Sequence, residues 1–237
     1  MISKYMCSSP YQIFYEFRFK DNTKKHFRIS LDPKLISIIY HEPVLKSDWM
    51  RLENQQCECC PLTGKTHFYC PVAINIGELT ESFKDMVSYE KCLVRCTTIE
   101  RTYLKNTSLM EGLASIFGVI IATSECPIMT FFKPMARFHL PFSTTQETVF
   151  RVTSIYMLRQ YFNRKNNLPA DLDMKVLDEH YKKVSLVNRG LISRLNTVVA
   201  NDADKNAINI LFSISQILSR EINYNLNSVE YLFETKE

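Results

Sequence analysis

The sequence predicts an α+β fold, in which a small N-terminal antiparallel β layer with a Cys-rich metal loop packs on a C-terminal helical bundle. Two patterns predict it: apolar and polar residues alternate in the first third of the chain, and apolar residues recur at helical spacing after Thr107. Hydrophobic residues make up 46% of the 237 residues, which is enough for a sizeable core. We expect a β-rich part over residues 1–104 and a helical bundle over residues 105–237, integrated into one domain.

The first expected element is a β-hairpin. Every second residue from Ile13 to Phe19 is apolar, and the same alternation returns from Phe27 to Leu31. Residues 21–23, Asp-Asn-Thr, supply the turn between the two runs.

A third strand is expected after an aperiodic segment and a short helix over residues 73–86. Residues 88–103 return to strand character, with Cys92 and Cys96 on the apolar face. Cysteines on such a face are small core residues rather than ligands. Three strands and the aperiodic segment 55–71 would then form one layer.

The helices of the second half are marked by their N-terminal signals. Ser108 with Glu111, and Thr144 with Glu147, are capping boxes, and the second opens a helix that reaches about Arg164. Apolar seams predict two further helices, over residues 177–198 and 207–218. Asn188 interrupts the first seam, where a buried polar residue fixes helix register. Capping is the expected role of residues 202–206.

The cysteines of the aperiodic segment form the strongest chemical signal. Cys57 and Cys60 have the C-x-x-C spacing at which a tight turn lets two thiolates share one metal ion, and Cys70 can return a third. Cys126 is the preferred fourth ligand because it shares a Cys-Pro dipeptide with Cys60 and Cys70. The other candidates for the fourth position are His67, Cys59 and Cys7.

Four thiolates with no open position are typical of structural Zn²⁺. Proline after cysteine also occurs around iron–sulfur clusters, so an iron–sulfur cluster is the alternative cofactor. A thioredoxin-type redox pair is the weaker interpretation, because Pro61 is awkwardly placed for a helix that starts at the second cysteine.

A second unusual stretch sets Arg137 and His139 between two prolines. If this stretch is extended, the two side chains project to the same side and could bind an anion or a small ligand. The free N–H groups of the helix that starts near Thr144 could contribute to such a site. The competing interpretation places Arg137 on backbone carbonyls and His139 in the packing of the bundle.

Four motifs resemble those of an uncharacterised bacterial family, a domain of unknown function. They are C-x-x-C-P-L at 57–62, C-P-x-A at 70–73, S-x-C-P at 124–127 and P-M-A-R-F-H-L-P-F at 134–142. The resemblance covers the chain from about Gln55 to its C-terminus. It implies that the cysteines of the family pattern are those at 57, 60, 70 and 126, and it implies no activity.

Composition narrows the classes of function. The formal net charge of +4 is a mild excess without a clustered basic face, so nucleic-acid binding is not favoured. The N-terminus lacks the apolar core of a signal peptide, and the longest apolar stretch is too short to span a membrane. We expect a cytoplasmic, metal-binding, non-catalytic module with a protein partner or a small anionic ligand. The alternative is a metal- or cluster-dependent sensor or enzyme with a pocket at Arg137 and His139.

Overall fold

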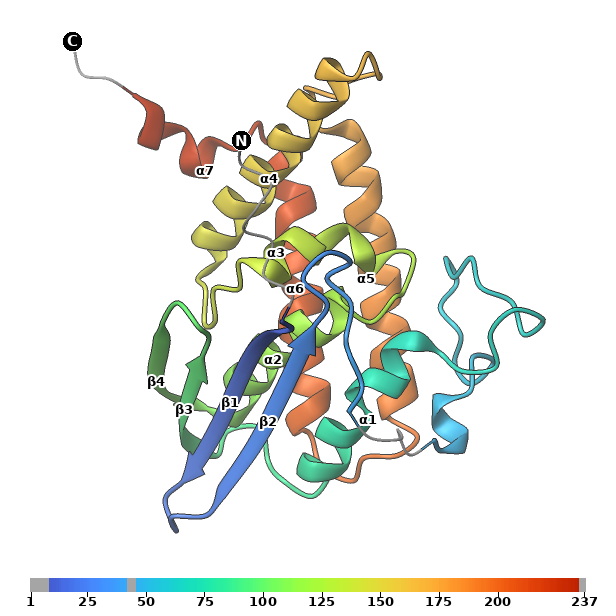
Figure 1. Cartoon of the computed structure of the whole chain (residues 1–237), viewed down its shortest axis with the longest axis vertical. Helices are drawn as coiled ribbons and strands as arrows, with labels where there is room; N and C mark the ends of the chain where they lie inside the picture. The colour runs from blue at the N-terminus through green and yellow to red at the C-terminus, as the bar shows by residue number, and fades with distance from the viewer. Residues whose placement is uncertain (1–8, 42–45, 235–237) are drawn as a thin grey trace.

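A computed structural model describes residues 9–41 and 46–234 and confirms the α+β class (Figure 1). Four strands form one antiparallel sheet in the order β2-β1-β3-β4: β1 (Tyr11–Phe19), β2 (Lys24–Leu31), β3 (Lys91–Thr97) and β4 (Thr102–Ser108). The helices of the described residues are α1 (Pro71–Phe83), α2 (Leu109–Ala122), α3 (Lys133–Arg137), α4 (Thr145–Lys165), α5 (Lys175–Leu195), α6 (Ala203–Asn223) and α7 (Asn227–Glu230). Short 3-10 helices are η1 (Asp48–Met50), η2 (Met129–Phe132) and η3 (Tyr231–Phe233).

The predicted hairpin is confirmed as β1 and β2, which pair from Tyr11–Leu31 to Arg18–Lys24. The prediction of a single strand over residues 88–103 is wrong, because this segment contains β3 and the start of β4. A turn that lacks glycine and proline separates them, with the Thr98 N–H donating to the Arg101 carbonyl at 2.9 Å. β4 therefore runs across the boundary at residues 104–105, and the sheet and the helices share one hydrophobic core.

Helix α2 packs directly on the sheet. Its predicted capping box of Ser108 and Glu111 is confirmed. A Cβ atom at Gly112 would lie 2.8 Å from the Phe17 ring and 2.9 Å from Val94, so only glycine permits this close approach. The opposite side of α2 contacts α6, which makes α2 the middle layer between sheet and bundle.

The long helices complete the molecule, with α5 and α6 running side by side along its length (Figure 1). The seam from Leu177 to Leu195 is buried on α5, as its spacing predicts. The expected capping role of Asp202 is corrected: it occupies the N-cap position of α6, but its carboxylate accepts the Ser88 N–H at 2.8 Å and ties α6 to the segment before β3.

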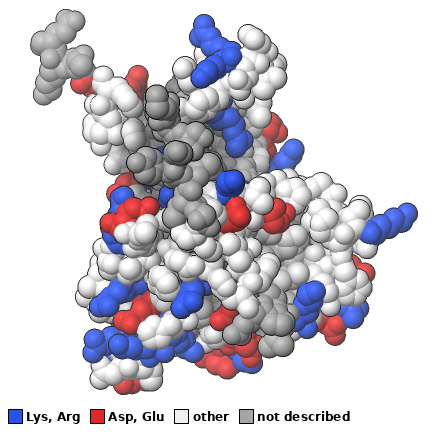
Figure 2. Space-filling view, viewed as in Figure 1, with Lys and Arg blue, Asp and Glu red and all other residues white. Residues whose placement is uncertain are grey.

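The surface in Figure 2 mixes charges of both signs, and its densest basic group covers the lower end of the β1–β2 hairpin. That face lacks the continuous basic stripe with which proteins follow a nucleic-acid backbone. Among the described helices, none has the length and apolar character needed to cross a membrane.

Candidate metal centre

The segment between η1 and α1 carries Cys57, Cys59 and Cys60 and lies beside α5 (Figure 1). The Cys60 N–H donates to the Cys57 carbonyl at 2.9 Å, which closes the tight turn expected of a C-x-x-C sequence. The Cys57 thiol donates to the Val187 carbonyl at 3.9 Å, and the Cys59 thiol donates to the Lys183 carbonyl at 3.5 Å. The cysteine turn is therefore docked on α5.

This docking depends on Gly190 of α5. A Cβ atom at this position would lie 2.7 Å from Sγ of Cys57 and 3.3 Å from its Cα. The first distance is shorter than real Cβ atoms are found to approach, so any side chain here would push the turn away from the helix. Gly190 thus sets the distance between α5 and Cys57.

Cys70 and Cys126 come from two other segments. Cys70 is the residue before α1, and its N–H donates to the Met50 carbonyl at 2.8 Å. Pro71 occupies the first position of α1, where its missing N–H leaves no hydrogen bond unmade. Cys126 lies in the turn after α2, and its carbonyl accepts the Thr130 N–H at 2.9 Å.

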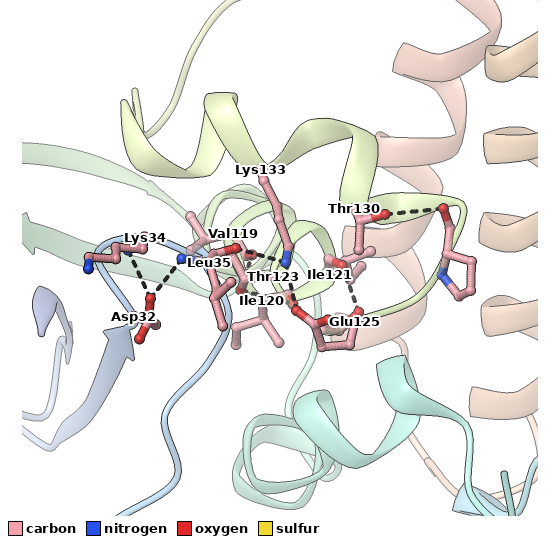
Figure 3. Close-up of polar contacts among 12 residues, drawn as sticks. Asp32, Lys34, Leu35, Val119, Ile120, Ile121, Thr123, Glu125, Thr130 and Lys133 are labelled. Atoms are coloured by element: carbon pink, nitrogen blue, oxygen red, sulfur yellow. Dashed lines mark hydrogen bonds and ion pairs between the residues drawn. The ribbon is translucent and has the colours of Figure 1, made fainter. Parts of the chain in front are cut away.

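The turn that carries Cys126 is fixed by Lys133 (Figure 3). The Lys133 ammonium donates to the Glu125 carboxylate at 2.7 Å and to the Leu35 carbonyl at 2.9 Å. Glu125 adopts a left-handed backbone conformation, with φ of 66°, which non-glycine residues enter only at a cost. The ion pair with Lys133 therefore stabilises the conformation that brings Cys126 back toward α1.

The predicted ligands lie within electrostatic reach of one another. Burial, together with negative charge on four nearby cysteines, raises the pKa of the Cys57 thiol to about 12; the four are Cys70, Cys59, Cys60 and Cys126. Three segments that are far apart in sequence thus bring their thiols to one region.

Nearby cysteines also affect the pKa of Cys126, and backbone N–H groups donate hydrogen bonds to its sulfur. The pKa of its thiol is raised to about 11, mainly by burial, although the backbone N–H groups of Met129 and Ile128 act to lower it by hydrogen bonding to the sulfur. Charge on Cys70 and Cys60 raises it. The N–H groups at the start of η2, those of residues 128 and 129, therefore point at this sulfur and favour its thiolate form.

A buried arginine lies beside these thiols. The Arg194 side chain is 2% exposed and donates to the carbonyls of Trp49 and Arg51, at 2.6 Å each, and of Leu52 at 3.3 Å. Burial lowers the pKa of its guanidinium, and charge on three cysteines raises it: Cys70, Cys57 and Cys60. Within the described residues Arg194 forms no ion pair with a carboxylate.

The cysteines lie near one another without forming a ready-made coordination sphere. In residues 9–41 and 46–234, no three His, Cys, Asp or Glu side chains are arranged so that they could hold a metal ion. Metal ligation by Cys57, Cys60, Cys70 and Cys126 therefore stays a prediction.

Comparison with known proteins places the chain in a family. A family model described as "Domain of unknown function (DUF6901)" matches residues 13–234. The chain belongs to the DUF6901 family. This confirms the resemblance to an uncharacterised family, while no curated protein and no solved structure matches the chain.

The alternative fourth ligands are placed differently in this DUF6901 chain. His67 is exposed, and its Nδ1 forms a hydrogen bond with the Thr66 hydroxyl at 3.0 Å. Cys59 donates to the Lys183 carbonyl, and charge on Cys60 raises the pKa of its thiol. Cys7 lies outside the described residues. For Cys126, in contrast, charge on both Cys60 and Cys70 raises the pKa of the thiol.

Cys92 and Cys96 are core residues, as their alternation predicts. Their side chains are 5% and 0% exposed on the inner face of β3. Burial raises the pKa of each thiol to about 11. Both therefore remain neutral packing groups at physiological pH.

Arg137 and His139 do not face one ligand together. Residues 133–137 are helical instead of extended and the helix ends at Arg137, so the shared direction expected of an extended stretch does not apply to Arg137 and His139. The Arg137 guanidinium stacks over the Tyr11 ring at 4.2 Å and pairs with Glu100 at 3.5 Å. His139 Nε2 instead contacts the Tyr15 hydroxyl at 2.6 Å.

The N–H groups of Thr144 and Glu147, at the start of α4, already have hydrogen-bond partners. The Glu147 N–H donates to the Thr144 hydroxyl at 3.2 Å, and the Thr144 N–H donates to the Glu147 carboxylate at 2.7 Å. The predicted capping box is therefore confirmed, and it uses N–H groups that an anion would otherwise bind.

Two residues of the centre, Gly190 and Arg194, are absent from the sequence-based site. With Val187 they fall at i, i+3 and i+7, on one side of α5. A glycine and an arginine at the edge of an otherwise apolar seam are the signal that could have pointed to a docked polar loop.

The role of Gly190 gives a direct prediction. Gly190→Ala is expected to lower the free energy of unfolding by about 1–3 kcal/mol, because the new methyl group overlaps Cys57. The matched control is Gly118→Ala on α2, where an added Cβ would meet nothing within 4 Å. That change should be neutral or stabilise by up to about 1 kcal/mol, through helix propensity alone. Urea unfolding of both variants checks this; equal effects of the two substitutions would contradict the close approach.

Proposed function

We propose that the chain is a metal-binding protein in which Cys57, Cys60, Cys70 and Cys126 hold one structural zinc ion. The observation that carries the proposal is that thiols from three separate segments act on one another's pKa beside the buried Arg194. The ion would join the 57–60 turn, the start of α1 and the turn after α2, and so brace the docked segment against the body of the domain.

The charge balance of the region supports this assignment. A zinc ion with four thiolates carries a net charge of −2, which is costly to bury without compensating groups. Arg194 supplies a buried cation, and the N–H groups of residues 128 and 129 donate to one of the sulfurs. Such outer groups orient and stabilise metal-bound thiolates.

The proposed role of the ion is structural. Four thiolates leave no open position for a substrate or water, so the ion supplies cross-links and not a reaction. We therefore propose a non-catalytic binding or regulatory module. An iron–sulfur cluster on the same four cysteines is the alternative, since thiolates serve both cofactors.

The test is the metal content of protein purified without oxygen. Elemental analysis should give one zinc per chain and a colourless solution, whereas iron with visible absorbance would favour the cluster. Serine substitution of any of the four cysteines should abolish metal binding and destabilise the fold, as should removal of the ion by a strong chelator.

Control variants separate ligation from packing. Cys92→Ala and Cys96→Ala remove buried thiols of the sheet and should retain one zinc per chain. If Cys126→Ser keeps its zinc and Cys59→Ser loses it, the fourth ligand is Cys59 and not Cys126. Stable wild-type protein that takes up neither zinc nor iron would overturn the proposal.

A further inference from the structure

A cavity of about 780 Å³ lies among α2, α4, α5 and α6, away from the cysteines. Its size is that of pockets that hold drug-sized ligands. Most of its wall is apolar, with Val119, Met135, Tyr181 and Ile214 among the lining residues. None of the four proposed metal ligands lines it, so the cavity needs a separate explanation.

One wall of the cavity is made by small residues of α2. Ala114, Gly118 and Ala122 are spaced by four residues, and all three line the cavity. A Cβ atom at Gly118 would meet no heavy atom within 4 Å. Glycine here is therefore not required by neighbouring protein atoms, and it leaves the space open.

Another lining residue carries a buried amide oxygen that has no hydrogen-bond partner among the described residues. Asn188 of α5 lines the cavity, is 2% exposed, and its Oδ1 makes no hydrogen bond within the described residues. An unsatisfied buried polar group of this kind costs about 1–3 kcal/mol. A molecule in the cavity that places a hydrogen-bond donor beside this oxygen would satisfy it.

The cavity also contains a cation that lacks an anion. Arg151 of α4 is half-buried in its wall and donates to the carbonyls of Phe138, at 2.6 Å, and Met135, at 3.4 Å. In the part of the chain that the structure describes it forms no ion pair, because the nearby Glu147 carboxylate is engaged by Thr144. The other charged lining residues are Lys105 and Glu111, and Glu111 is held by the cap of α2.

Neutral polar groups surround this cation. His139 lines the cavity beside Arg151, and burial together with the Arg151 charge lowers its pKa to about 3, so it is uncharged at neutral pH. Its Nε2 contacts the Tyr15 hydroxyl, which also contacts the Ser115 hydroxyl at 2.8 Å. These groups offer hydrogen bonds and no negative charge to a ligand.

We infer that this cavity binds an amphipathic organic monocarboxylate, with its carboxylate on Arg151 and its apolar body along the Ala114–Gly118–Ala122 wall. An arginine forms two parallel hydrogen bonds to a carboxylate, and a half-buried one binds it more strongly than in water. The apolar walls favour an alkyl or ring body over a highly charged ligand. This inference does not rest on the metal proposal.

The test uses decanoate and decan-1-ol, which share an apolar chain and differ in charge. Isothermal titration calorimetry of the 237-residue chain should show one decanoate site. Arg151→Gln should weaken decanoate binding by at least about tenfold, the loss expected for a charge-assisted pair, and leave decan-1-ol within about twofold. Unchanged alcohol binding shows that the variant keeps the cavity.

A second pair of variants tests the apolar wall. Gly118→Leu should abolish binding of both probes while the thermal midpoint stays equal or rises, because the side chain fills open space. Gly118→Ala, which adds one carbon, should retain at least half of the affinity. Equal affinity of wild type and Gly118→Leu, or equal loss of both probes in Arg151→Gln with an unchanged thermal midpoint, would overturn the inference. Absence of decanoate binding by the wild type would overturn it as well.

Discussion

The free energy of unfolding is expected to fall by about 3–5 kcal/mol when Arg194 is replaced by methionine, the largest single effect that we predict. Methionine fills a similar volume but leaves the carbonyls of Trp49, Arg51 and Leu52 without their donor. Those carbonyls belong to the segment that leads to Cys57, so the loss should also weaken the docking of that segment on α5. Urea unfolding monitored by circular dichroism measures the change.

Two further variants test whether the stability depends on the hydrogen bonds of Arg194 or only on its positive charge. Arg194→Lys keeps the positive charge but lacks the planar fork that reaches three carbonyls, so it should lose an intermediate amount of stability. Arg189→Met, on the exposed side of the same helix, removes a charge that is not buried and should change stability by less than about 0.5 kcal/mol. A loss below about 1 kcal/mol in Arg194→Met would contradict the role given to its hydrogen bonds.

Asp204→Asn is expected to stabilise the protein by about 2–4 kcal/mol at pH 8 and by much less near pH 4. Asp204 is 1% exposed near the start of α6, and neither carboxylate oxygen has a hydrogen-bond partner within the described residues. Burial raises its pKa from 3.8 to about 8. The start of the helix offers only partial compensation for a negative charge.

The sign of the pH dependence follows from this shift. Well below pH 3.8 Asp204 is protonated in both the folded and the unfolded state, so its titration does not change the stability there. As the pH rises from about 4 to about 8, the unfolded chain releases the proton while the folded protein retains it, so stability falls. Asparagine resembles the protonated form, and the gain should therefore grow over the same range and level off above it.

Asp202 gives a matched control with the opposite sign. Its carboxylate accepts the Ser88 N–H and hydroxyl, and the backbone bond is the main cause of its lowered pKa. Asp202→Asn should thus destabilise the protein at pH 8. Thermal midpoints of the wild type and both variants, measured from pH 4 to pH 9, test these two opposite effects on stability. A constant difference between wild type and Asp204→Asn across that range would show that Asp204 keeps an ordinary pKa.

The sequence by itself determined the local structure of this protein. The alternation from Ile13 to Phe19 and the capping boxes at Ser108 and Thr144 depend on neighbouring residues, and the structure has each of them. The turn between β3 and β4 was not predictable in this way, because it contains neither glycine nor proline. The α+β class and the membership of an uncharacterised family followed from the same local patterns and motifs.

Only the tertiary structure decided which distant residues share a site. Spacing identified Cys57 and Cys60 as a pair, but it could not show that α5 supplies Gly190 and Arg194 beside them, since those contacts join positions more than 130 residues apart. It also could not separate Arg137 from His139, because the direction of a side chain depends on whether its backbone is helical or extended. The cavity that Asn188 and Arg151 line arises from the packing of four helices. That packing is set by side chains that the order of the sequence does not bring together.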